Sequence, residues 1–204
     1  MKLVGLTGGI GSGKSSVSAR LAAKGAVIVD ADAIVREVQV PGTEVFDAIV
    51  ERFGPGVVAA DGTLDRPALA AEAFGDPAAL AELNALVHPA VGVEIARRVA
   101  EGAGTDAVVV LDVPLLVEGG RHAVAGILVV DAPEEAALER LARDRGMSEA
   151  DARARMASQA SREDRLAKAD FVVENAGTLE DLDAAVDAAW AWIQTLPDEP
   201  APVG

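Results

Sequence analysis

The 204-residue sequence contains no cysteine and no tyrosine, and aromatic residues make up only 3% of it. The lack of cysteine excludes disulfide bonds and thiolate metal sites, and it fits a reducing compartment. Half of the residues are nevertheless hydrophobic, so the core must be built mainly from Ala, Val, Leu and Ile. Such a composition suits helices packed on a parallel sheet.

The sequence also lacks a long uncharged apolar stretch, and only two residues precede the first apolar run, which starts at Leu3. It predicts neither a transmembrane helix nor a signal peptide, so we expect a cytoplasmic protein without a membrane partner. The formal net charge of −15 also disfavours binding to nucleic acid.

Positive charge is concentrated in one segment, since seven of the fourteen arginines lie between residues 140 and 165. We expect most of them to form ion pairs on solvated helix faces. One or two are expected to bind phosphate, because a triphosphate requires planar, permanently charged donors besides a single lysine.

Residues 8–15 read GGIGSGKS, between an apolar run and a helical pattern. This is the spacing of a phosphate-binding loop, in which glycines let backbone N–H groups approach phosphate oxygens. Lys14 would add a point charge, and the Ser15 hydroxyl would ligate Mg²⁺. We therefore expect ATP and Mg²⁺ as ligands. The loop residues expected to contact the nucleotide are Gly8, Gly9, Gly11, Ser12, Gly13, Lys14, Ser15 and Ser16.

Five short apolar runs rich in valine and isoleucine predict strands at residues 3–7, 26–29, 107–113, 126–130 and 171–173. They are continuous rather than alternating, which favours a parallel sheet covered on both faces. Helices are predicted at residues 31–38, 43–53, 67–74, 77–87, 89–101 and 178–195. The predicted fold class is an α/β P-loop fold of three α/β/α layers around a five-stranded parallel sheet.

Two intervals between strands are longer than ordinary crossovers. Residues 35–105 are predicted to form a helical acceptor-binding insertion, and residues 133–168 a helical lid. The nucleotide-binding core would comprise residues 1–34, 106–132 and 169–196, followed by a flexible tail at residues 197–204. Movable insertions favour a kinase over a switch protein, because a kinase must exclude water from the transferred phosphate.

Acidic residues lie at the carboxyl ends of two of the predicted strands, at the edge where an open α/β sheet binds its ligands. Asp32 is the expected base that takes the proton of an acceptor hydroxyl. For Asp30, helix capping and a functional role are both open. Asp112 ends an apolar strand and is expected to hold Mg²⁺ together with Ser15. The sequence leaves open whether His88 and Pro114 are structural or line the acceptor pocket.

Taken together, these patterns resemble the dephospho-coenzyme A kinase family over residues 2 to about 190. The resemblance is carried, in the family's order, by residues 6–15, 30–32 with 36–37, 61–62 with 64–66, 83–84 with 88–89, 114–116 with Glu118, Gln159 with Arg165, and 169–170 with 175–177. It implies transfer of the ATP γ-phosphate to the 3′-hydroxyl of dephospho-coenzyme A, the last step of coenzyme A synthesis.

The resemblance also implies roles for individual residues. Asp32 would be the base, Lys14 would bind the phosphate groups of ATP, and Arg140 would be the lid arginine that closes on the triphosphate. The remaining implied contacts are Arg36, His88, Pro114 and Leu115 with the acceptor, and Asn175 and Gly177 with adenine. Val117 departs from the family, which usually has an aromatic residue before Glu118.

Two other functions remain open from the sequence. The first is a P-loop kinase for a nucleoside monophosphate or another metabolite. The second is a nucleotide switch without transfer chemistry, which is disfavoured because an Asn-Lys-x-Asp stretch is absent and lysine occurs only at positions 2, 14, 24 and 168. The sequence predicts no oligomeric state.

Overall fold

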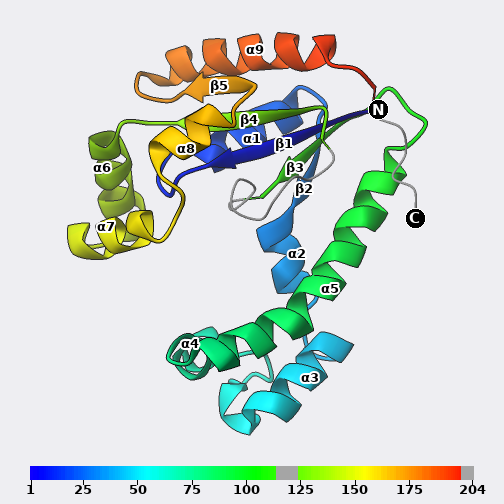
Figure 1. Cartoon of the computed structure of the whole chain (residues 1–204), viewed down its shortest axis with the longest axis vertical. Coiled ribbons are helices and arrows are strands. Elements are labelled where there is room, and N and C mark those ends of the chain that lie inside the picture. The colour runs from blue at the N-terminus through cyan, green and yellow to red at the C-terminus, as the bar shows by residue number, and fades with distance from the viewer. Residues whose placement is uncertain (114–123, 199–204) are drawn as a thin grey trace. The chain divides into compact units, whose positions relative to one another are not determined.

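The computed structural model describes residues 1–113 and 124–198 (Figure 1). The chain divides into two compact units, one of residues 1–29 and 99–204 and the other of residues 30–98. The bounds of the second unit, 30–98, differ by five and seven residues from those of the insertion expected at 35–105. Its role as an acceptor-binding domain, and that of residues 133–168 as a lid, remain predictions.

The first unit is built on a five-stranded sheet in the order β2-β3-β1-β4-β5. Its strands are β1 (Lys2–Gly8), β2 (Val27–Asp30), β3 (Val108–Asp112), β4 (Gly126–Asp131) and β5 (Phe171–Glu174). The β1–β3, β1–β4 and β4–β5 pairs are parallel, and Leu6 lies opposite both Asp112 and Leu128. The predicted fold class is confirmed, and the carboxyl ends of these strands reach the same edge.

Five helices complete the described part of this unit: α1 (Lys14–Ala23), α6 (Glu134–Arg145), α7 (Glu149–Ala157), α8 (Arg162–Ala167) and α9 (Leu179–Thr195). Helix α9 starts with a capping box, in which the Thr178 hydroxyl accepts from Asp181 N and the Asp181 carboxylate accepts from Thr178 N. This arrangement satisfies backbone donors that the first turn leaves unpaired.

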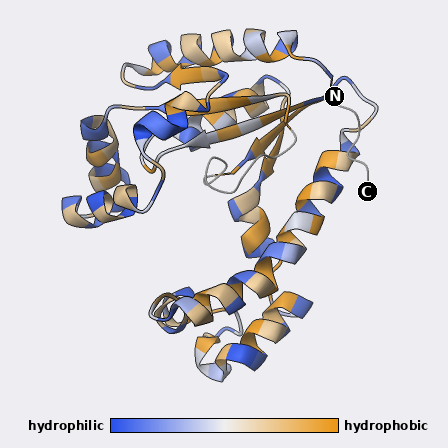
Figure 2. Ribbon diagram, viewed as in Figure 1, coloured by the Kyte–Doolittle hydropathy of each residue, from blue (hydrophilic) through white to orange (hydrophobic). Residues whose placement is uncertain are grey.

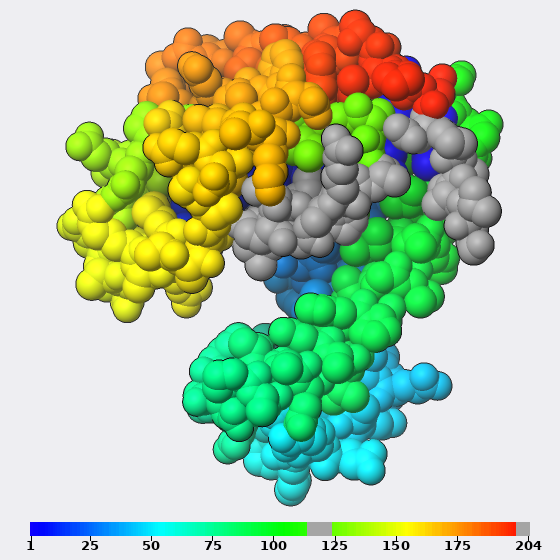
Figure 3. Space-filling view, in the orientation of Figure 1, coloured from blue at the N-terminus to red at the C-terminus, as the bar shows by residue number. Residues whose placement is uncertain are grey.

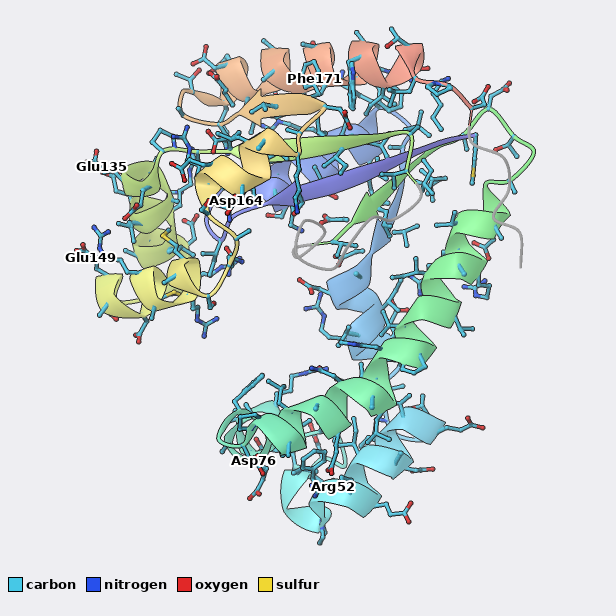
Figure 4. The ribbon with its side chains drawn as sticks, viewed as in Figure 1. Arg52, Asp76, Glu135, Glu149, Asp164 and Phe171 are labelled. Carbon is cyan, nitrogen blue, oxygen red and sulfur yellow. The ribbon has the colours of Figure 1, made fainter. Side chains whose placement is uncertain are left out.

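The core of the first unit is aliphatic, as the composition predicted. Buried side chains from β1, β3, β4, β5, α1 and α9 form one cluster, and hydrophobic residues make up much of the strands (Figure 2). Aromatic residues lie only at its margin, where the Phe171 and Trp192 rings are 5.2 Å apart between β5 and α9 (Figure 4).

The second unit contains α2 (Ala31–Glu37), α3 (Glu44–Phe53), the short 3₁₀ turn η1 (Pro55–Val57), α4 (Arg66–Phe74) and most of α5 (Pro77–Glu101). Three of these helices begin at side-chain caps, since Asp30, Thr43 and Asp65 each accept a hydrogen bond from a backbone N–H three residues later. Ile49, Val57 and Leu69 are buried within the unit.

The prediction of separate helices at 77–87 and 89–101 is wrong, because α5 runs through Pro89 (Figure 1). Proline removes one backbone donor and disfavours a helical residue before it, which costs about 3 kcal/mol. Val87 and Val91 are both buried and lie one helical turn apart, on either side of the proline. Packing on both sides of Pro89 therefore keeps the helix continuous.

Among the described residues, α5 is the one helix that could cross a membrane by length and composition alone. A long helix in a water-soluble protein passes the same test.

We predict that Leu182→Ala lowers the free energy of unfolding by about 2–5 kcal/mol, since Leu182 lies on the buried face of α9 and is 2% exposed. Leu179→Ala is the matched control on the same helix, because Leu179 is 67% exposed, and its effect should stay within about 0.5 kcal/mol. Urea titration with an unchanged m-value measures both. Equal losses in the two variants would contradict the placement of the core.

Candidate functional site

The predicted phosphate loop joins the end of β1 to the start of α1. Gly11 and Gly13 have φ angles of 78° and 90°, a left-handed conformation that glycine adopts without strain. Gly13 is the N-cap of α1, so the unpaired N–H groups of the first helical turn follow the loop directly. This is the backbone geometry of an anion-binding site.

The protein packed around the loop also leaves little room for a side chain at two of its glycines. A Cβ at Gly9 would lie 2.7 Å from Arg165 Nη2, and a Cβ at Gly11 would lie 2.7 Å from the carbonyl oxygen of Ala137 on α6. Sequence reasoning assigned these glycines to phosphate approach alone. The structure adds that residues of the 133–168 segment pack directly against the loop.

Lys14 and Asp112, which the sequence predicted for different ligands, form an ion pair in which Lys14 Nζ donates to Asp112 Oδ1. Asp112 is only 3% exposed at the end of β3, where an uncompensated carboxylate would be costly. The pair therefore keeps both charges of the site compensated.

Asn175 links the loop to β5 and α6. It is 7% exposed, and its Nδ2 donates to Ser12 O at 2.8 Å. Arg140 Nη2 donates to Asn175 O at 2.7 Å, and Arg140 Nη1 donates to Ser12 O at 3.4 Å. The structure thus gives Asn175 and Arg140 a role in holding the loop, while their contacts with adenine and triphosphate stay predictions.

Gly177, the other residue expected at adenine, also has a structural reason. A Cβ at this position would overlap with the Asp181 carboxylate, which caps α9. The glycine is required by the capping box whether or not a base lies nearby.

The two acids at the carboxyl end of β2 have different environments. Asp30 caps α2, because its carboxylate accepts a hydrogen bond from Ala33 N at 3.0 Å. Of the two roles that the sequence left open for Asp30, the structure supports helix capping. Asp32 is exposed in the first turn of α2, and Arg36 is exposed one turn later on the same helix face. Neither side chain forms a hydrogen bond or ion pair within residues 1–113 and 124–198.

His88 is exposed on α5 and likewise makes no hydrogen bond with any described residue. A structural role for His88 would have placed it at the end of a predicted helix, with its side chain in a hydrogen bond. That alternative is wrong, because α5 continues past His88. Pro114 and Leu115, together with Val117 and Glu118, lie outside the described residues.

No group of three or more His, Asp or Glu side chains that could hold a metal occurs in the described part of the chain. The exposed Ser15 hydroxyl and the Asp112 carboxylate are oxygen donors of the kind that Mg²⁺ prefers. Two protein ligands are enough for Mg²⁺ when phosphate oxygens and water complete its coordination.

Two contacts that the motif reading did not predict join the lid segment to the loop. Ile10 N donates to Gln159 Oε1 at 3.0 Å, and Arg165 lies against Gly9 while its Nη1 donates to Ala160 O. The density of arginines between residues 140 and 165 was the available signal, but spacing alone does not tell which of them reaches the loop.

The family model for dephospho-CoA kinase matches residues 2–181 of this chain. The chain belongs to the dephospho-CoA kinase family. A relative from Streptomyces avermitilis named dephospho-CoA kinase is 55% identical over 192 residues, which cover 94% of this chain and 93% of the relative. The resemblance stated from the motifs is confirmed.

Solved structures agree on the fold. A Thermus thermophilus protein has a TM-score of 0.80 and 36% identity, covering 94% of this chain and 97% of its own. A dephospho-CoA kinase from Campylobacter jejuni has a TM-score of 0.71 and 23% identity, with 95% and 98% coverage. The family match covers the phosphate loop, Asp32, His88 and Arg140. It therefore extends over both structural units.

We predict that Gly13→Ala weakens ATP binding by about tenfold or more, because its Cβ would overlap with Asn175 Nδ2 and displace the loop. Gly25→Ala is the matched control: Gly25 also has a positive φ, of 101°, but nothing lies within 4 Å of its Cβ position. The control should lose about 1–2 kcal/mol of stability and keep its ATP affinity. Calorimetric titration with ATP measures the affinity of both variants, and thermal unfolding measures their stability. Unchanged ATP affinity in Gly13→Ala would refute the packing argument.

Proposed function

We propose that this chain transfers the γ-phosphoryl group of ATP to the 3′-hydroxyl of dephospho-coenzyme A, giving coenzyme A and ADP in the last step of coenzyme A synthesis. The observation that carries this proposal is the family match over residues 2–181, which spans the helical unit as well as the loop. A P-loop alone would support only nucleotide binding.

On the donor side, the loop backbone and Lys14 would bind the triphosphate. Lys14 would exchange the Asp112 carboxylate, its partner in the structure, for phosphate oxygens. Ser15 and Asp112 would then hold Mg²⁺, which when bound neutralises phosphate charge. In the absence of nucleotide, the ion pair would thus compensate the charges of Lys14 and Asp112. Once nucleotide binds, phosphate oxygens and Mg²⁺ would compensate them instead.

On the acceptor side, Asp32 would accept the 3′-hydroxyl proton as that oxygen attacks the γ-phosphorus and the bond to ADP breaks. Its support is that the carboxylate is exposed and is not engaged by any described residue. Arg36, one turn along α2, and His88 would bind the acceptor, whose diphosphate suits a guanidinium. Pro114 and Leu115 are proposed to complete this pocket.

Arg140 would stabilise charge on the transferred group. Its guanidinium is held by two carbonyl oxygens, which orient the side chain without neutralising it. Asn175 and Gly177 are proposed to lie near adenine, at the junction of β5 and α9.

We further propose that the enzyme is cytoplasmic and uses only small-molecule substrates. The net charge of −15 supports this, because it repels nucleic acid and anionic lipid surfaces.

The reaction itself is the first test. With ATP and Mg²⁺, ADP should form rapidly in the presence of dephospho-coenzyme A and much more slowly with AMP, shikimate or gluconate, because the match to the dephospho-CoA kinase family extends over the helical unit in which we propose that the acceptor binds. A coupled assay for ADP measures this, and mass spectrometry identifies the product. Comparable turnover of all four acceptors would overturn the proposal.

We predict that Asp32→Asn lowers kcat about a hundredfold or more while ATP still binds, because the amide cannot accept the proton. Asp30→Asn is the matched control two residues away. Asparagine caps a helix about as well as aspartate, so α2 should remain intact and kcat should stay within about twofold. The assignment of the base fails if the two variants have similar kcat values.

A further inference from the structure

The arginines between residues 140 and 165 fall into groups by what holds them. Three of the seven form ion pairs with carboxylates. These pairs are Arg143–Asp144, Arg153–Glu134, Arg153–Glu149 and Arg162–Asp131. Arg145 and Arg155 are exposed. Because an ion-paired guanidinium is already compensated, the paired arginines have little charge left for a ligand.

Arg140 and Arg165 differ from the rest of this group. Both are half-buried, and both donate to backbone carbonyls. Within the described residues neither forms an ion pair with a carboxylate, and Nε and Nη2 of Arg165 make no hydrogen bond. A carbonyl orients the guanidinium but leaves its positive charge uncompensated, which suits an anionic ligand.

Arg165 is also in direct contact with the phosphate loop. Its Nη2 lies where a Cβ of Gly9 would be only 2.7 Å away, so the guanidinium rests on the loop backbone. The next residue is fixed from the same segment, because Ile10 N donates to Gln159 Oε1 at 3.0 Å. Glutamine accepts this bond without adding a negative charge beside the site.

Beside this contact lies a cavity of about 510 Å³, a size typical of ligand sites. Gly9, Ile10, Ser12, Gln159 and Arg165 are among its lining residues. Ser12 is 4% exposed, and its Oγ has no hydrogen-bond partner within the described residues. A buried hydroxyl of this kind requires a polar partner, which a ligand oxygen would supply.

The other charges on the cavity wall are largely compensated. Arg153 and Arg162 line it but are ion-paired with Glu134 and Asp131, which line it as well. The remaining acid, Glu163, is exposed in the first turn of α8. Acidic residues farther out, such as Glu135 and Glu149, extend away from α6 and α7 (Figure 4).

Helices α7 and α8, coloured yellow, form a continuous surface with β5 and α9 (Figure 3).

We infer that Arg165 is a second catalytic arginine in addition to Arg140. Arg165 binds the triphosphate of ATP next to Gly9 of the phosphate loop. This inference rests on the proposed function and names a further residue of that site. Gln159 is a positioning residue that holds Ile10, and with it the loop, under the guanidinium. The unengaged Nε–H and Nη2–H groups donate to phosphate oxygens and offset the charge of the transferred group.

The test compares Arg165→Met with Arg165→Lys and a control, Arg143→Ala, in the full-length chain. Methionine keeps an apolar stem against Gly9 but removes the charge, whereas lysine restores the charge without the planar fork. Arg143 is the matched control because its side chain is 71% exposed and paired with its neighbour Asp144. Calorimetry gives the Kd of ATP, and steady-state kinetics give kcat and the KM of dephospho-coenzyme A.

Arg165→Met should raise the Kd of ATP and lower kcat by about tenfold each, and Arg165→Lys should recover part of both. The control should stay within about twofold of the unmodified chain. ATP affinity and kcat that are unchanged in Arg165→Met overturn the inference, as does an effect confined to the acceptor KM.

Should Arg165→Met fail to fold, as judged by its thermal midpoint, Arg165→Lys decides. Loss of the planar fork should then raise the Kd of ATP by about threefold or more, and an unchanged Kd overturns the inference. If the unmodified chain binds ATP but does not phosphorylate dephospho-coenzyme A, the proposed function fails while the ATP affinities still decide on Arg165.

Discussion

The hydrogen bond from Asn175 Nδ2 to Ser12 O holds the phosphate loop in place. The loop has few internal bonds of its own, and its left-handed glycines offer no side chains to pack. Its conformation therefore depends on groups that arrive from β5 and the lid segment. Arg140 shares the same carbonyl, and Gln159 holds the other half of the loop. The anion site is thus preorganised by residues more than a hundred positions away.

Charge compensation then separates structural from functional side chains. Lys14 and Asp112 neutralise each other beside the loop, and most lid arginines are paired with carboxylates or exposed. The side chains to which we assign roles in phosphoryl transfer are not paired with carboxylates or cations in the described residues: Asp32 and Arg36 on α2, and the carbonyl-held Arg140 and Arg165. Among the arginines between residues 140 and 165, Arg140 and Arg165 are the informative ones, because they are half-buried and are held by carbonyl oxygens rather than by carboxylates.

Much of the fold could be predicted because its signals are local. The five apolar runs match the five strands within one or two residues, and the Thr178 capping box marks the start of α9. The break expected at Pro89 was wrong because the buried neighbours Val87 and Val91 outweigh a local backbone preference. Likewise, the sequence could not decide whether Asp30 caps or reacts, since both roles use the same carboxylate.

By itself, the sequence determined the family, the phosphate loop and the parallel sheet, because spacing along the chain encodes backbone geometry and the face that each element buries. Only the tertiary structure decided which charges are compensated. Gln159 and Ile10 are 149 positions apart, and the partner of Arg162 lies 31 positions away in β4. No periodicity relates such residues, so the choice of Arg165 over its neighbours depends on how the lid helices pack against the loop.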